Sequence, residues 1–175
     1  MRLAEVLRDK RAEVVEKWVD AIVRTYPAVT AEFLKRKKDQ FLNPVGHTIR
    51  TETAKIVEQL VEAEPSAESV GEFLDRLIRV RAIQDFTPAQ ALGFIFELKG
   101  IIRDVLGEEL GVELLGELRE MERRIDRLAL LAFDIYVGCK EQVYQIRVKE
   151  IQNNTFMLLK RAGMLVELDQ PNPDS

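Results

Sequence analysis

Apolar residues recur at intervals of three and four positions along most of the chain, a spacing typical of amphipathic α-helices. Pro or Gly stands between most of these segments and marks where one helix ends before the next begins. The pattern predicts an all-α fold. The expected helices run from about residue 3 to Thr25, around Phe33 and Leu34, from Pro44 to Glu62, from Ser66 or Ser69 to near Gln84, from Ala89 to Leu106 and from Glu113 to Lys160.

Two of these helices begin at residues that favour a helix start. Asn43 is a good N-cap, because its side chain can accept a hydrogen bond from a free backbone N–H, and Pro44 fits the first helical position. Thr87 and Pro88 repeat this arrangement, and Gln90 can close a capping box. Asn43 and Thr87 are therefore the predicted helix caps.

The stretch Leu128–Cys139, LALLAFDIYVGC, is apolar at nearly every position. A helix that is apolar all round has to be covered on every side, so this stretch predicts a buried central helix. A buried Asp134 would need a partner, because an unpaired carboxylate costs several kcal/mol inside a protein. The candidates are Arg79 and Arg81, which stand beside strongly apolar positions, and a buried Asp134 pair with one of them is the structural hypothesis.

Two apolar stripes follow one another along the last helix. The first suits the core of the domain. The second predicts a protruding arm, about residues 145–165, that packs on a second chain; a helix folded back on the bundle is the alternative. The domain would then span 1–165, followed by an acidic disordered tail, 166–175. The stripes are Leu114, Leu118, Met121, Ile125, Leu128, Ala132, Ile135 and Cys139, then Tyr144, Val148, Ile151, Thr155 and Leu158.

Composition limits the function further. The 175 residues suit one domain, and a net charge of −4 with a pI near 5.3 gives no general attraction to nucleic acid. A single cysteine, Cys139, excludes an intramolecular disulfide and suits a reducing compartment. The longest apolar runs are too short for a membrane span. The expected location is the cytoplasm, without membrane insertion.

The sequence holds little that predicts catalysis. It has no helix-spaced metal ligands, no phosphate-binding glycine loop and no nucleophile elbow, so we expect neither an enzyme nor a metal or cofactor. His47 is the only histidine and could ligate haem, although a residue in a first helical turn is more often a capping group. The hypothetical ligand pocket is formed by His47, Phe94, Asp134 and Tyr136.

Three stretches together resemble a known family. They are FLNPVGHTIR, RVRAIQDFTPAQALGFIFELK and LALLAFDIYVGCKEQVYQIRVKE, and the likeness extends from about Leu7 to Glu150. The family is the RsbRD N-terminal domain, the sensory input domain of the RsbT co-antagonist proteins of bacterial stressosomes. Ala89 and Lys140 stand where the family pattern has Ser and Arg.

The resemblance implies a globin-like fold without haem that forms a homodimer and passes a signal through its last helix to a STAS domain. No STAS sequence is present, so the phosphorylation sites of that domain cannot be carried over. The expectation is a non-enzymatic RsbR-like sensor domain of the stress response, with a protein partner bound through the C-terminal helix. The alternatives are a haem or small-ligand globin using His47, and a scaffold subunit without a ligand.

Overall fold

The computed structural model describes residues 2–36, 41–62, 67–84 and 86–164, and this part of the chain is all-α, as predicted. The predicted tail, 166–175, lies outside the described residues. None of the described helices is both long enough and apolar enough to cross a membrane. The helices are α1 (Leu3–Asp9), α2 (Arg11–Arg24), α3 (Ala28–Arg36), α4 (Pro44–Leu60), α5 (Ala67–Ile83), α6 (Pro88–Leu106), two short 3₁₀ turns (Gly107–Glu109 and Val112–Leu114) and α7 (Leu115–Arg161).

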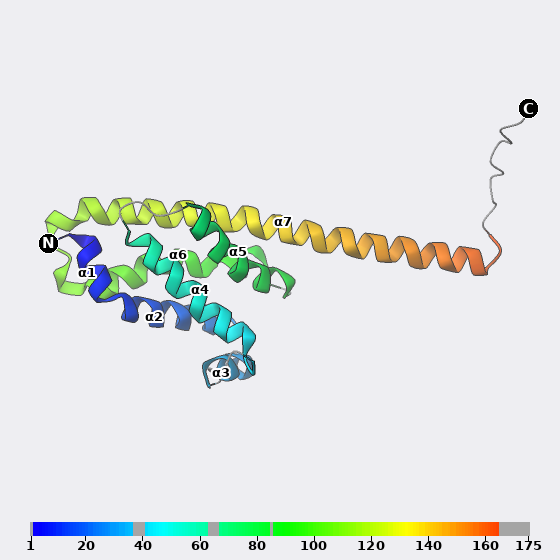
Figure 1. Cartoon of the computed structure of the whole chain (residues 1–175), viewed down its shortest axis with the longest axis horizontal. Helices are drawn as coiled ribbons and strands as arrows, with labels where there is room; N and C mark the ends of the chain where they lie inside the picture. Colours follow the sequence, from blue (N-terminus) through cyan, green and yellow to red (C-terminus); the bar gives the residue numbers. More distant parts are fainter. Residues whose placement is uncertain (1, 37–40, 63–66, 85, 165–175) are drawn as a thin grey trace, which may run out of the picture. The chain divides into compact units, whose positions relative to one another are not determined.

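The chain forms two compact units, residues 1–139 and 140–175, and α7 contributes to both. In the first unit α2 packs against α4 and α6, and α4 packs against α5 (Figure 1). The centre of this core is built by fully buried side chains from those helices. They include Trp18 and Ile22 of α2, Ile49 and Ile56 of α4, Leu74 and Leu77 of α5, and Phe94 and Ile95 of α6.

The prediction that Leu128–Cys139 forms a central helix buried on every side is wrong. This part of α7 buries only the face that carries the first apolar stripe, and its other face is exposed. The apolar side chains on the other face are therefore not covered by the described residues of the first unit. The buried face carries Leu128, Ala129, Ala132, Tyr136 and Cys139, and the exposed face carries Leu130, Leu131, Phe133 and Val137.

The N-terminal segment also differs from the prediction, because the chain bends at Lys10 and forms two helices instead of one. Lys10 has φ −94° and ψ 9°, outside the helical range, and its Nζ donates to the carbonyl oxygen of Val105 at 2.9 Å. The bend lets α1 bury Leu3 and Leu7 while α2 buries Trp18. One straight helix could not present all of these side chains to the same core.

Both predicted helix caps are confirmed. The Asn43 side chain accepts a hydrogen bond from the Gly46 N–H at 2.8 Å, and its Nδ2 donates to the Leu34 carbonyl oxygen at 3.1 Å. Thr87 caps α6 and forms the predicted capping box with Gln90. The start of α5 is different: Ser69 lies inside the helix, and Ser66 lies outside the described residues.

Gly107 ends α6 in a backbone conformation, φ 50° and ψ −125°, that only glycine adopts without strain. We expect Gly107→Ala to lower the free energy of unfolding by about 1–3 kcal/mol, although no atom lies within 4 Å of the added Cβ. Gly100→Ala is the matched control, because Gly100 also has open space at its Cβ but lies inside α6. It should be neutral or stabilise the protein by up to about 1 kcal/mol. Urea denaturation measures both, and equal effects would contradict the strain at Gly107.

Candidate functional site

Arg81 of α5 is charged and yet wholly buried. Its Nε donates to the Ala91 carbonyl oxygen at 2.9 Å, and its Nη2 donates to the Gln90 carbonyl oxygen at 2.7 Å and to Thr25 Oγ1 at 2.9 Å. All three acceptors are neutral. Within the described residues Arg81 has no ion pair, and burying a charge without one is costly in a protein interior.

Three aromatic rings surround the guanidinium of Arg81. Its Cζ lies 4.6 Å from the ring centre of Phe86, 5.1 Å from that of Phe94 and 5.3 Å from that of Tyr26. Contacts with ring faces stabilise a desolvated cation in part. Burial lowers the pKa of Arg81 from its usual value, and the nearby Tyr26 acts in the opposite direction. We call these four residues, together with Gln84, the Arg81 cluster.

Some polar atoms of the Arg81 cluster are shielded from solvent and make no close hydrogen bond among the described residues. They are Arg81 Nη1, Tyr26 Oη and Gln84 Oε1. Burial raises the pKa of Tyr26, while the charge of Arg81 and side-chain hydrogen bonding with Arg81 and Gln84 act to lower it, so the phenol lies beside both groups. The cluster therefore brings the polar groups of Arg81, Tyr26 and Gln84 together around one buried charge.

A surface hollow of about 610 Å³ opens beside the Arg81 cluster. Tyr26, Gln84 and Phe86 belong to both the cluster and the hollow wall. The hollow lies between the end of α2, the first part of α3, the end of α5 and the start of α6. It is lined by Thr25, Tyr26, Pro27, Thr30, Gln84, Phe86 and Gln90.

The cluster is also tied to α7. The Tyr136 hydroxyl donates to the Phe86 carbonyl oxygen at 2.7 Å. The Phe86 ring meets the Tyr26 ring edge to face, with the ring centres 5.2 Å apart. Phe86 thus connects α7 to the buried guanidinium.

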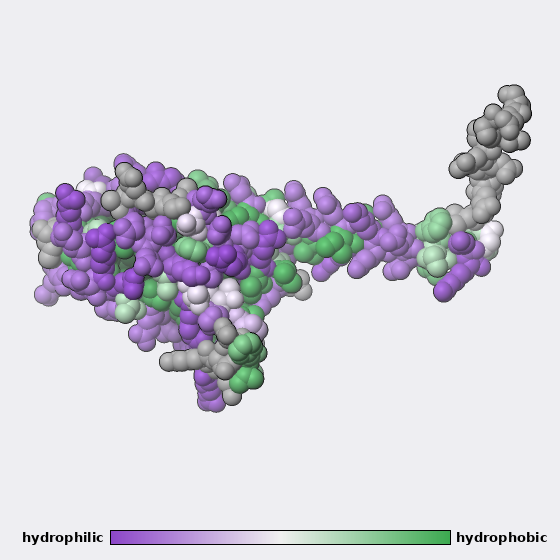
Figure 2. Space-filling model, in the orientation of Figure 1, coloured by the Kyte–Doolittle hydropathy of each residue, from purple (hydrophilic) through white to green (hydrophobic). Residues whose placement is uncertain are grey.

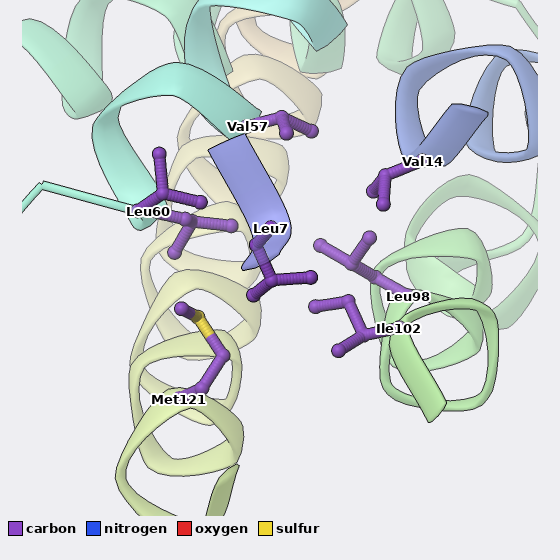
Figure 3. Close-up of a pocket in the computed structure, with 8 residues that line it drawn as sticks. Leu7, Val14, Val57, Leu60, Leu98, Ile102 and Met121 are labelled. Carbon is purple, nitrogen blue, oxygen red and sulfur yellow. The ribbon is translucent and has the colours of Figure 1, made fainter. Parts of the chain in front are cut away.

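A second, much smaller cavity lies inside the bundle, between α1, α2, α4, α6 and α7 (Figure 3). Its volume is only about 10 Å³, and its walls are apolar. That volume is about the minimum for one water molecule, and an apolar cavity of this size stays dry. It is a small packing defect and not a ligand site. The side chains that line it are Leu7, Val14, Val57, Leu60, Val61, Leu98, Ile102 and Met121.

The residues of the hypothetical ligand pocket are not placed around a common cavity. His47 and Asp134 are exposed, whereas Phe94 and Tyr136 are buried. His47 Nε2 lies 3.4 Å from Thr51 Oγ1, and Phe94 packs against Trp18 with ring centres 5.8 Å apart. None of the four lines the apolar cavity inside the bundle or the hollow beside the Arg81 cluster.

The predicted buried pair between Asp134 and an arginine is wrong. Arg79 is exposed and pairs with Asp75, with Nε 2.6 Å from Oδ2. Arg81 is buried as expected but bonds the neutral oxygens described above, and Asp134 is exposed. The reason is the orientation of α7, because Ala132 and Tyr136 occupy the buried face and leave Asp134 between them pointing outward.

Sequence reasoning identified Arg81 but missed Tyr26, Gln84 and Phe86 around it. The sequence feature that pointed to the cluster was an arginine within an apolar helical segment, because a buried arginine requires polar or aromatic partners. Nothing in the sequence shows that the end of α2 and the start of α6 would supply them. Within the described residues no group of three His, Cys, Asp or Glu side chains could hold a metal ion.

The exposed apolar face of α7 is the second candidate site. In the first unit it comprises Leu130, Phe133 and Val137, spaced by three and four residues. In the second unit every described side chain from Tyr144 to Met164 is exposed, and apolar side chains form patches among hydrophilic ones (Figure 2). One series of exposed apolar residues recurs every seven positions, the repeat that pairs helices in coiled coils. It consists of Leu130, Val137, Tyr144, Ile151 and Leu158.

Comparison with known proteins assigns the chain to a family. A protein of Archaeoglobus fulgidus (strain ATCC 49558 / DSM 4304 / JCM 9628 / NBRC 100126 / VC-16), named only as an uncharacterized protein, is 26% identical over 152 residues, 86% of this chain and 90% of the relative. No solved structure matches the chain. Residues 12–151 match the RsbT co-antagonist protein rsbRD N-terminal domain, which confirms the resemblance seen in the sequence. Since the match covers most of the chain, the protein belongs to the family of rsbRD N-terminal domains.

Proposed function

We propose that the protein is a non-enzymatic sensory or regulatory domain that works as a haem-free, globin-like homodimer. In this proposal the C-terminal part of α7 relays a signal to a partner protein in a cytoplasmic stress response. Family membership supports a regulatory role related to the stressosome. The observation that carries the dimer is the series of exposed apolar residues on α7.

The spacing of that series favours a paired helix. Two helices that each carry apolar residues every seven positions can bury them against one another along a continuous seam. Each large aliphatic side chain that becomes buried contributes about 1.5–3 kcal/mol. Ile151 and Leu158 are both 65% exposed in the single chain, so most of this contribution is still available to an interface.

The interval between apolar positions is not uniform. Leu130, Phe133 and Val137 follow a three-then-four spacing, whereas Tyr144, Val148 and Ile151 follow a four-then-three spacing. The seven-residue interval itself stays unbroken, and only the second apolar position of each repeat moves from three to four residues after the first. In this proposal the paired helices have two arrangements, and a signal acts by favouring one of them.

The haem alternative needs an axial ligand that faces an apolar cavity. His47 is exposed, and it does not line the apolar cavity inside the bundle. The other alternative, a scaffold subunit without a ligand, differs from a sensor because it has no small-molecule site. The regulatory homodimer is therefore the function that the geometry supports best.

The test is the native mass of the full-length chain and of a truncation that ends at Arg147, with an absorption spectrum of each after haem addition. We expect a full-length dimer, a truncated monomer and no Soret band. A full-length monomer at micromolar concentration would contradict the homodimer. A Soret band that disappears in His47→Ala would replace the proposal by the haem alternative.

A further inference from the structure

Two ion pairs show how α6 and α7 lie against each other. Lys99 Nζ lies 2.6 Å from Asp126 Oδ1, and Arg103 Nε donates to Glu122 Oε1 at 2.8 Å. The later residue of α6 pairs with the earlier residue of α7, so the two helices are antiparallel neighbours. Residues four apart on a helix share a face, and Glu122 and Asp126 therefore mark the face of α7 that borders α6.

Further along α7 the same face becomes apolar. Leu130, Phe133 and Val137 follow Asp126 at successive intervals of four, three and four residues, which keeps them in line with it on a helix. All three side chains are exposed. The exposed apolar face of α7 in the first unit therefore runs along the edge that borders α6.

The helix α6 changes in the same way. Phe96 precedes Lys99 by three residues, and its side chain is 54% exposed. Gly93 and Ala89 continue this face toward the start of α6, three and seven residues before Phe96. No atom lies within 4 Å of a Cβ built on Gly93, so another helix can approach the backbone of α6 closely at this point.

Because the helices are antiparallel, these positions of α6 lie level with the apolar positions of α7. Together they form a surface without any charged residue, whereas ion pairs occupy the other end of the same two helices. A contiguous exposed apolar surface of this kind is typical of an interaction site. We call it the α6–α7 patch, and its members are Ala89, Gly93, Phe96, Leu130, Phe133 and Val137.

The seven-residue series on α7 indicates what covers the patch. That series passes through the patch at Leu130 and Val137 before it continues to Tyr144. Packed helices lie about 8–10 Å apart, so a helix that pairs with α7 along this series also lies beside α6. Phe96 is the large side chain of α6 that such a helix would meet first.

We propose that the α6–α7 patch is the part of the homodimer interface that the first unit supplies, and that a second copy of this chain covers it. The α7 helix of the second copy packs on Leu130 and Val137 and buries Phe96, and Gly93 leaves room for its backbone. This inference rests on the proposed function and adds α6 to the interface. Six residues bury far less than the roughly 1,600 Å² of a standard interface, so the patch strengthens the pairing of the arm and does not replace it.

The experiment is sedimentation equilibrium of the full chain carrying Phe96→Arg. We expect Kd of the dimer to rise roughly tenfold or more, because the second copy would have to bury a charge against apolar side chains. Val29→Arg is the matched control, since it also replaces an exposed apolar side chain of the first unit by arginine, but on α3. It should leave Kd within about threefold. An unchanged Kd in Phe96→Arg, or equal weakening by both variants, would overturn the inference.

Gly93→Gln provides a second test, in which stability and association should respond differently. Gln is a better helix former than Gly, and the space around the new Cβ is open, so Tm of the monomer should stay the same or rise. The added side chain stands between α6 and the second copy, so Kd should rise about tenfold. Far-UV circular dichroism below the dimer Kd gives the monomer Tm. A lower monomer Tm with unchanged Kd would assign Gly93 to the single chain and contradict the patch.

The inference and the proposed function fail in different ways. If Ile151→Arg in the arm weakens the dimer and Phe96→Arg does not, the homodimer stands and the α6–α7 patch is excluded from its interface. If the unmodified chain is a monomer at micromolar concentration, both are overturned. Weakening by Ile151→Arg and by Phe96→Arg, with Val29→Arg unchanged, supports both.

Discussion

Replacing Trp18 with alanine should lower the free energy of unfolding by about 3–5 kcal/mol, the range found when large aromatic side chains are removed from protein cores. Trp18 is fully buried, and its indole Nε1 donates to the Phe94 carbonyl oxygen at 2.8 Å. The substitution therefore leaves a cavity between α2 and α6 and an unpaired carbonyl oxygen. Urea denaturation followed by far-UV circular dichroism measures the loss.

Val29→Ala is the control for Trp18→Ala. Val29 belongs to α3 and is 83% exposed, so its truncation should change the free energy of unfolding by no more than about 0.5 kcal/mol. A loss below about 1 kcal/mol in Trp18→Ala would show that the core around α2 and α6 collapses to fill the space.

The second large expected effect is a weakening of the proposed homodimer. Ile151→Arg places a charge within the proposed seam of α7, where the homodimer would have to bury it without a partner. We expect the dimer to weaken by at least about 3 kcal/mol, roughly a hundredfold in Kd. Sedimentation equilibrium measures the change. Because Ile151 is exposed in the single chain, the stability of the monomer should not change.

Asn153→Arg introduces the same charge two positions away, outside the seven-residue series and also at an exposed position. It should leave the dimer constant within about threefold. Equal weakening by both substitutions would point to general charge repulsion. Absence of any effect from Ile151→Arg would exclude this part of α7 from the interface.

Local chemistry explains which parts of the fold could be predicted from the sequence. The starts of α4 and α6 depend on a side chain and the backbone three residues away, so Asn43 and Thr87 identify them without any knowledge of the fold. The bend at Lys10 depends on Val105, far away in the sequence, whose carbonyl oxygen the Lys10 Nζ reaches. No local pattern contains that information.

The misinterpretation of Leu128–Cys139 has a different origin. An apolar position has to be covered, but hydropathy does not say whether the same chain or another chain covers it. The spacing of Leu128, Ala132 and Cys139 predicted the buried face correctly. The additional apolar residues Leu130 and Phe133 were assigned to the same core, although the structure leaves them exposed.

The Arg81 cluster could be predicted only in part, because its members come from three segments of the chain. The apolar surroundings of Arg81 along α5 indicated a buried charge that needs partners. The choice of Asp134 as partner followed from opposite charge alone. In the structure Tyr26 and Phe86 surround Arg81, and their positions follow from how α2 and α6 pack.

Trp18 is the only tryptophan of the chain. Its ring contacts Phe94, and the ring of Phe94 in turn lies 5.1 Å from the Arg81 guanidinium. The intrinsic fluorescence of the protein therefore comes from one emitter, separated from the buried cation by a single aromatic ring. A change in the wavelength or intensity of that emission would report rearrangement at Arg81 without any attached dye, at concentrations low enough to follow monomer and dimer separately.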